Sequence, residues 1–140
     1  MKVPPAMFVP DASVILKWVL DAEDEPGHAA ANLLLGRWQQ GELGLAVPTL
    51  WVYEVGNVLC LKRPADAAEA LTALCDLGLS ELPLSPGLIQ RAVALSAGHG
   101  ITFYDAAYLA VAMEREPILL TADGRFVRRL PSGVPVELLA

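Results

Sequence analysis

The chain alternates between short apolar runs and longer stretches in which apolar residues recur every three or four positions. The short runs predict strands at residues 6–9, 43–47, 79–84, 118–121 and 134–138, and residues 101–104 read as the end of a further β-prone run. The periodic stretches predict helices at residues 12–20, 28–40, 49–62, 65–77, 86–96 and 124–130, and one more that opens at Asp105 and ends near residue 116. Pro48 stands where the third helix is expected to start, and residues 98–100 read as a loop. Strands alternating with helices are typical of an α/β domain.

Length and composition narrow the classes of protein that fit this pattern. We predict one domain over residues 1–140, because 54% of the residues are hydrophobic and only 19% are charged, which is typical of a folded core and not of disorder. The formal charge of -6 lacks the basic excess of most nucleic-acid-binding domains, although a pocket of acids lowers the net charge without describing the outer surface. Cys60 and Cys75 lack CxxC spacing, so we expect reduced thiols packed in helices and no zinc site.

Neither a secretion signal nor a membrane span is expected. The first eleven residues, MKVPPAMFVPD, contain one Lys and three prolines and no apolar stretch suited to a signal peptide. No uninterrupted apolar run reaches the roughly 18 residues that a membrane-spanning helix needs. These features predict a cytoplasmic protein that does not enter a membrane.

Three aspartates follow apolar runs at points where a helix pattern begins. Asp11 ends FVPD, Asp105 follows ITFY, and Asp123 ends LLTAD. If the three runs are neighbouring parallel strands, their carboxyl ends share the sheet edge at which α/β folds bind ligands. The three carboxylates would then repel one another unless cations neutralise them, so the pattern indicates a divalent metal.

Each aspartate also has a purely structural interpretation. Asp11 and Asp123 suit the N-cap of a helix, and Thr102 followed by Asp105 has the spacing of a capping box. Ser13 suits the same capping, or it holds a metal-bound water. Capping alone accepts Ser, Thr or Asn as readily as Asp. The occurrence of the ionised residue at all three positions therefore indicates that the negative charge itself has a role.

A fourth acid lies on an otherwise apolar helix. Glu54 and Asn57 are three residues apart and therefore share a helix face. A carboxylate there is costly to bury unless it is paired or metal-bound, and the alternative is a Glu at the rim that is hydrogen-bonded to solvent. Oxygen ligands without His or thiolate favour magnesium or manganese, and such a site suits phosphodiester hydrolysis. Arg125, Arg128 and Arg129 are ordinary surface charge, or they hold a phosphate backbone beside the metal.

Four segments of the chain resemble one protein family. The matching pieces are VPDASVILKWVL, PTLWVYEVGNVL, TFYDAAYLAVA and TADGRF, which occur in the family's order and spacing. On these motifs the chain is similar to the PIN-domain ribonucleases, specifically the VapC-type toxins of bacterial and archaeal toxin–antitoxin pairs. The residues 1–5 before the first strand depart from the family pattern, and we assign them no role.

The resemblance implies a fold, a site and partners. It implies a three-layer α/β/α sandwich with a mostly parallel central sheet. It implies that Asp11, Glu54, Asp105 and Asp123 are the catalytic, metal-binding acids for Mg²⁺ or Mn²⁺, with Asp11 and Asp105 as the most direct ligands. Ser13, Asn57 and Thr121 match supporting positions around that pocket. It further implies an RNA substrate, homodimerisation and inhibition by a cognate antitoxin protein.

Two other classes of function compete with an endoribonuclease toxin. A non-catalytic binding module with the same fold would use the metal only structurally, and it would lose stability on chelation without turning over any nucleic acid. A phospho-acceptor signalling domain also clusters acids after strands. That domain needs an acid pair after its first strand and a late Lys, whereas Asp11 has no acidic neighbour and no Lys follows Lys62.

Overall fold

The centre of the molecule is a five-stranded, all-parallel sheet with the strand order β3-β2-β1-β4-β5. The structure, a computed structural model, describes residues 6–20, 27–115 and 117–139. The strands, all short, are β1 (Met7–Pro10), β2 (Gly44–Pro48), β3 (Ser80–Leu82), β4 (Ile118–Thr121) and β5 (Val136–Leu138). Five of the predicted strands are therefore confirmed, and the last one lies at a sheet edge.

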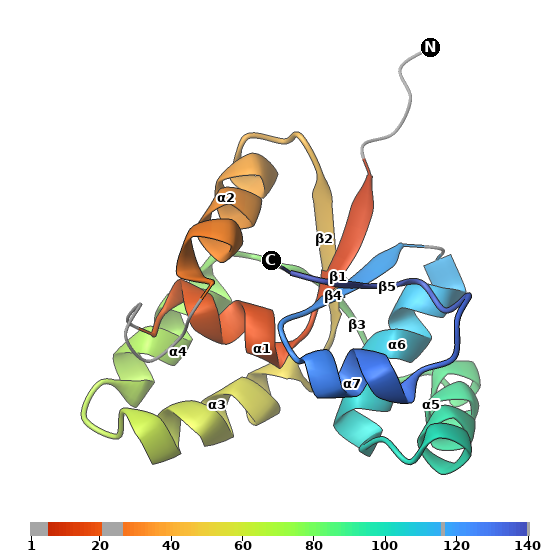
Figure 1. Cartoon of the computed structure of the whole chain (residues 1–140). Helices are drawn as coiled ribbons and strands as arrows, with labels where there is room; N and C mark the ends of the chain where they lie inside the picture. The colour runs from red at the N-terminus through yellow and green to blue at the C-terminus, as the bar shows by residue number, and fades with distance from the viewer. Residues whose placement is uncertain (1–5, 21–26, 116, 140) are drawn as a thin grey trace.

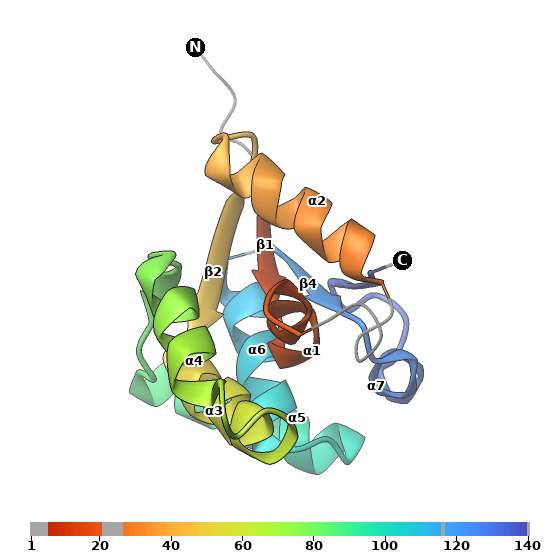
Figure 2. The same ribbon diagram turned by 90° about the vertical axis from the view of Figure 1, so that its left-hand side faces the viewer.

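Helices cover both faces of this sheet. They are α1 (Ala12–Ile15), its 3-10 continuation η1 (Leu16–Trp18), α2 (His28–Gln39), α3 (Trp51–Lys62), α4 (Ala67–Asp76), α5 (Pro86–His99), α6 (Phe103–Arg115) and α7 (Gly124–Arg129). In Figure 1 the sheet runs through the middle, with α1 to α4 on one side and α5 and α6 on the other. Figure 2 shows α3 and α4 packed side by side. This confirms the predicted three-layer α/β/α sandwich.

The core lies between the sheet and these helices. Val9, Val47 and Leu119 on the three central strands are fully buried, and the middle of α6 is buried from Ala106 to Ala112. Such near-continuous apolar runs are what a parallel sheet covered on both faces requires. Helix α6 packs against β1, β2 and β4, so its first turn is held close to the carboxyl ends of those strands.

Residues 101–104 do not form the end of a strand, and that prediction is wrong. Helix α5 runs on to His99, Gly100 ends it in the left-handed conformation (φ 63°), and α6 already begins at Phe103. The expected loop at 98–100 is therefore mostly helix. Only Ile101 of the ITFY run is buried, while the next three side chains are exposed. The strand prediction therefore arose from one buried residue, Ile101, in a tight connection between two helices.

Three smaller expectations also differ from the structure. Pro48 is the last residue of β2 and not the first of a helix, because α3 starts only at Trp51. The helix expected over 12–20 is split into α1 and η1. Cys60 and Cys75 are free and lie in helices as expected, but both are exposed and not packed. Within the described residues no helix is long and apolar enough to cross a membrane.

Candidate active site

Asp11 lies directly after β1, at the start of α1. Its Oδ1 accepts a hydrogen bond from the backbone N–H of Val14 (3.3 Å), so the capping role is real. The side chain is nevertheless only 5% exposed. Burial raises the pKa of Asp11 from 3.8 to about 6, hydrogen bonds from Ser13 and Thr121 partly oppose the rise, and the charge of Asp105 adds to it. A capping aspartate at a free helix end needs no such burial.

Ser13 and Thr121 connect the ends of β1 and β4 around Asp11. The Ser13 hydroxyl donates to Oδ1 of Asp11 (2.5 Å) and accepts from the backbone N–H of Ala122 (2.8 Å). The Thr121 hydroxyl lies 3.4 Å from that of Ser13 and accepts from the backbone N–H of Asp123 (3.1 Å). We call these two hydroxyls with Asp11 the strand-end network. It holds one carboxylate in place with one hydroxyl from α1, directly after β1, and one from the end of β4.

Asp123 follows β4 and is the N-cap of α7. Its Oδ1 accepts from the backbone N–H groups of Arg125 (2.9 Å) and Phe126 (3.3 Å), and the side chain is exposed. Because β1 and β4 are paired neighbours, Asp11 and Asp123 leave the sheet at the same edge, as the spacing predicted. Asp123 acts on the site mainly through its charge, which raises the pKa of Asp105.

Asp105 reaches the same edge from a helix and not from a strand. It lies in the first turn of α6, where its backbone N–H donates to the hydroxyl of Thr102 (3.1 Å), which confirms half of the predicted capping box. The carboxylate is half-buried. Burial is the main cause that raises its pKa, with the charge of Asp123 adding and the Thr102 hydroxyl and the Arg129 guanidinium opposing. The position was predicted correctly, but for the wrong structural reason.

Glu54 contributes a fourth carboxylate from α3. It is half-buried, and desolvation together with the charges of Asp105 and Asp11 raises its pKa to about 7, although the nearby Tyr108 hydroxyl partly opposes this. Its Oε1 is buried with no hydrogen-bond partner in the described residues. The Glu54 carboxylate is therefore not fully solvated, in contrast to the alternative of a rim glutamate hydrogen-bonded to solvent. Asn57, one turn further along α3, is exposed.

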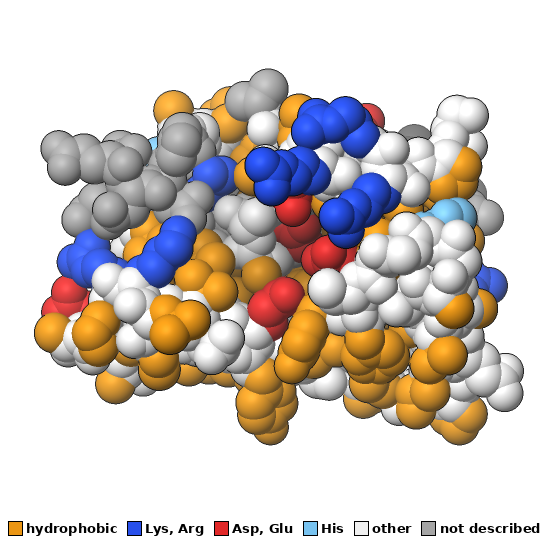
Figure 3. Space-filling model, turned by 60° about the horizontal axis from the view of Figure 1, so that its bottom comes forward, with side chains coloured by type: hydrophobic (Ala, Val, Ile, Leu, Met, Phe, Trp, Pro, Cys, Tyr) orange, Lys and Arg blue, Asp and Glu red, His pale blue; other side chains and the backbone are white. Residues whose placement is uncertain are grey.

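Together the four acids form one electrostatic cluster. The charge of Asp105 raises the pKa values of Asp11 and Glu54, the charge of Asp11 raises that of Glu54, and the charge of Asp123 raises that of Asp105. Figure 3 shows acidic side chains gathered in a hollow at the centre of this face, with basic side chains beside them. The all-oxygen donor set and the unpartnered Oε1 of Glu54 suit a hard divalent ion. Within the described residues, however, no three acidic, His or Cys side chains stand close enough to hold one ion, so a shared ion would need the side chains to move together.

Basic residues of α7 border the cluster. Arg125, Arg128 and Arg129 are all exposed on this short helix. Arg129 is near enough to lower the pKa of Asp105, and its Nη1 also donates to the backbone carbonyl of Gly100 (3.5 Å). Of the three guanidinium groups, that of Arg129 is therefore placed beside the acids.

The sequence analysis missed one residue of this region, Tyr108. Its side chain is fully buried, and its hydroxyl has no hydrogen-bond partner in the described residues although Glu54, Asp11 and Asp105 all act on it. Burial and those three charges raise the pKa of this phenol, which therefore stays protonated. The sequence feature that could have identified Tyr108 is its position three residues after Asp105, which places both side chains on the same helix face.

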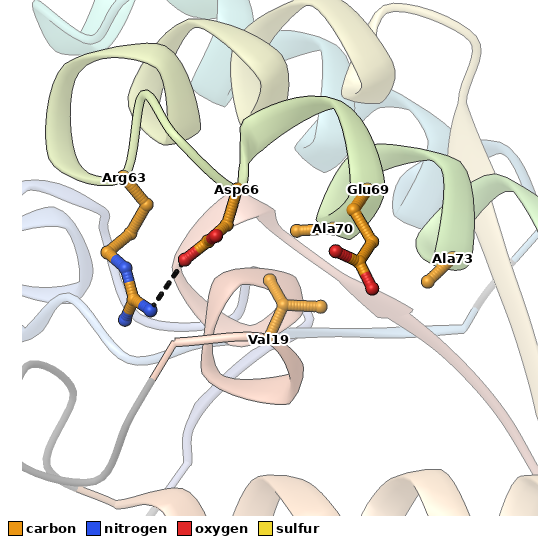
Figure 4. A pocket seen from close by; sticks show the side chains of 6 residues that line it. All are labelled: Val19, Arg63, Asp66, Glu69, Ala70 and Ala73. Atoms are coloured by element: carbon orange, nitrogen blue, oxygen red, sulfur yellow. Dashed lines mark hydrogen bonds and ion pairs between the residues drawn. The ribbon is translucent and has the colours of Figure 1, made fainter.

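A separate pocket lies away from the acids. Figure 4 shows it between the end of η1 and α4, lined by Val19, Arg63, Asp66, Glu69, Ala70 and Ala73. Arg63 and Asp66 form an ion pair across it (2.9 Å). None of the four clustered carboxylates lines this pocket, so it is no part of the candidate site.

This fold and this cluster of acids agree with one family. The PIN domain family model matches residues 8–129, nearly the whole described chain, and the chain belongs to the PIN domain family. Its curated relatives carry the name VapC. Ribonuclease VapC1 from Mycobacterium tuberculosis is 37% identical over 97 residues, which are 65% of this chain and 70% of the relative. Exonuclease VapC9 from Pyrobaculum aerophilum is 28% identical over 106 residues, which are 74% and 80%.

Solved structures support the same fold. The crystal structure of VapBC2 from Rickettsia felis, bound to a DNA fragment from its promoter, superposes with a TM-score of 0.69 and covers 96% of this chain and 99% of the matched chain. At 12% identity this likeness concerns the fold alone. The family expected from the four motifs is thus confirmed, and the motifs lie within the matched range.

Proposed function

We propose that the chain is a Mg²⁺- or Mn²⁺-dependent endoribonuclease, the toxin component of a type II toxin–antitoxin system. Its site for RNA phosphodiester hydrolysis comprises Asp11, Glu54, Asp105 and Asp123. The observation that carries this proposal is the convergence of four carboxylates from four elements at one sheet edge, two of them with pKa values raised to about 6 and about 7. Relatives named as a ribonuclease and an exonuclease support the nuclease class.

The metal would be held mainly by Asp11 and Asp105, with Glu54 and Asp123 completing the shell or orienting water. When bound, a divalent ion supplies positive charge for the phosphate oxygens and lowers the pKa of a water. The strand-end network keeps the Asp11 carboxylate oriented, because Ser13 donates to it from one strand end while Thr121 bridges to the other. Arg125, Arg128 and Arg129 would hold the RNA backbone beside the acids.

The proposed partners are a cognate antitoxin and a second copy of the chain. A structural neighbour is a VapBC complex, which supports an antitoxin for this chain as well. The exposed apolar side chains of Tyr53 and Leu61 on α3 and of Ile89 and Val93 on α5 support a covered face, as a homodimer would provide.

RNA cleavage by the purified protein tests the proposed activity. We expect cleavage of both linear and circular single-stranded RNA with Mg²⁺ or Mn²⁺, and none with EDTA, because only an endonuclease opens a circle. Asp11→Asn and Asp105→Asn are expected to lower the rate by at least about 100-fold while the far-UV circular dichroism is unchanged. Glu69→Gln, which alters an exposed acid on α4, is the matched control and is expected to cleave normally.

The same experiment separates the competing interpretations. If the protein shortened linear RNA from its ends but left circular RNA intact, it would be an exonuclease and not an endonuclease. A melting temperature that falls on chelation, without turnover of any RNA, would identify a binding module with a structural metal. Unchanged cleavage by both aspartate variants would disprove the carboxylate site.

A further inference from the structure

The hydroxyl of Tyr108 is the feature of this region that the four acids do not explain. Tyr108 is on α6 one turn after Asp105, and its side chain is completely buried. A Phe would fill the same apolar space without a polar atom to bury, and an unpaired buried hydroxyl destabilises a protein. The hydroxyl therefore requires a partner in some state of the protein.

Two unpartnered atoms in this region are complementary. Within the described residues the buried side-chain atoms without a hydrogen bond are the Tyr108 hydroxyl and Oε1 of Glu54. The hydroxyl lies close enough to the Glu54 carboxylate for hydrogen bonding between them to contribute to the pKa shifts of both groups, although neither atom reaches full hydrogen-bond geometry. The charges of Asp11 and Asp105 also act on the hydroxyl. A phenol donates and a carboxylate accepts, and a hydrogen bond between them would satisfy both atoms.

We propose that Tyr108 is a positioning residue whose hydroxyl donates to Glu54 and so holds this carboxylate toward Asp11 and Asp105, where the metal would bind. The role rests on the proposed metal site and concerns a residue that does not touch the metal. Tyr108 suits it because α6 fixes its backbone against β1, β2 and β4, whereas Glu54 is on the separate helix α3. The phenol thereby orients the Glu54 carboxylate by donating a hydrogen bond, as the Ser13 hydroxyl does for Asp11.

A double-mutant cycle without metal tests the contact itself. Urea unfolding in EDTA is measured for the wild type, Tyr108→Phe, Glu54→Ala and the double variant. If the two groups interact, the effects of the single changes do not add. Tyr104→Phe, which removes an exposed hydroxyl from the same helix, is combined with Glu54→Ala as the matched control and is expected to be additive. Additivity for Tyr108 as well would overturn the proposal.

Metal binding tests the positioning role. Titration of Mn²⁺, followed by electron paramagnetic resonance, is expected to show about tenfold weaker binding to Tyr108→Phe than to the wild type, the loss typical when an outer partner of a metal ligand is removed. In RNA cleavage at fixed Mn²⁺ we expect a lower kcat with an unchanged KM. Tyr104→Phe is expected to bind Mn²⁺ like the wild type. Equal Mn²⁺ affinity of Tyr108→Phe and the wild type would refute the role.

The two experiments also separate this inference from the proposed function. If the wild type bound no Mn²⁺, the metal-dependent function and the positioning role would fail together, while a non-additive cycle would still establish the contact. If the wild type bound Mn²⁺ and cleaved RNA but Tyr108→Phe behaved identically, only the positioning role would fail. Should Tyr108→Phe not fold, ¹³C labelling at the tyrosine ring Cζ gives a second readout, since Glu54→Ala should then shift the Tyr108 signal and leave that of Tyr104 in place.

Discussion

The candidate site has a strand-borne half and a helix-borne half that are held in different ways. Asp11 follows β1, is almost fully buried, and receives hydrogen bonds from Ser13 and Val14. Glu54 and Asp105 stand on α3 and α6, are half-buried, and have fewer partners, with Oε1 of Glu54 unpaired. The first half is organised before any ligand arrives, whereas the second retains freedom to move.

This difference bears on the proposed metal site. Three carboxylates with raised pKa values are unfavourable in the absence of a cation, since burial and mutual repulsion both disfavour their charged forms. Hydrogen bonds from Ser13, Thr121 and Val14 offset part of this at Asp11, whereas at Glu54 the Tyr108 hydroxyl alone opposes it. The helix-borne half should therefore respond most to a bound ion, and the strand-borne half least.

The largest effect expected is on the pH dependence of stability in the metal-free protein. Because the folded-state pKa values of Asp11 and Glu54 are raised from 3.8 and 4.5 to about 6 and about 7, the stability that these groups contribute is full below the unfolded values. It is lost progressively as the pH rises from there to about 6 and about 7. For Asp11 alone the loss is on the order of 3 kcal/mol. We expect the melting temperature in EDTA to fall between pH 5 and pH 8, and excess Mg²⁺ to restore it at pH 8.

Asp11→Asn sharpens this test, because an asparagine retains the capping oxygen without the charge. The variant should melt several degrees higher than the wild type at pH 8 in EDTA, and the gain should shrink at pH 5. Scanning fluorimetry across this pH range measures both. A wild-type melting temperature that rises from pH 5 to pH 8 in EDTA would contradict the electrostatic account.

An intermediate effect is expected when each half loses its own hydroxyl. Ser13→Ala removes a donor to a buried carboxylate and leaves the Ala122 N–H without its acceptor, so it should cost about 2 kcal/mol at pH 8. Thr102→Ala removes a helix cap near Asp105 and should cost about 1 kcal/mol. Urea unfolding gives both values. Ser13→Thr, which keeps the hydroxyl, is the control, and an equal cost for the two alanine variants would argue against the distinction between the halves.

The smallest effect concerns the basic border of the helix-borne half. Arg129→Ala removes a positive charge that lowers the pKa of Asp105. The same charge repels a cation at the proposed site, so Mn²⁺ should bind slightly more tightly to the variant at pH 7. The side chain is exposed, and the change in affinity should be below about fivefold. Calorimetric titration checks this, with Arg128→Ala as the neighbouring control. Weaker Mn²⁺ binding by the Arg129 variant would contradict the sign assigned to this charge.

The sequence predicted the strand-borne half of the site better than the helix-borne half. Asp11 and Asp123 were predicted at one sheet edge because an apolar run followed by Asp marks a strand end, and pairing of β1 with β4 confirms it. The placement of Asp105 after a strand was wrong, since hydrophobic periodicity does not distinguish a short strand from a buried residue that joins two helices. The burial of Glu54 and the presence of Tyr108 depend on how α3 and α6 meet across the sheet. Such contacts between distant segments leave no local pattern in a single sequence.

The strand-end network has a consequence for the order in which the chain becomes competent. Ser13 and Ala122 are 109 positions apart, so their hydrogen bond cannot form until nearly all of the chain has left the ribosome. A nascent or prematurely ended chain that lacks β4 presents Asp11 without the neighbouring strand that completes its surroundings. Assembly of the acidic centre is thereby delayed to the last stage of synthesis.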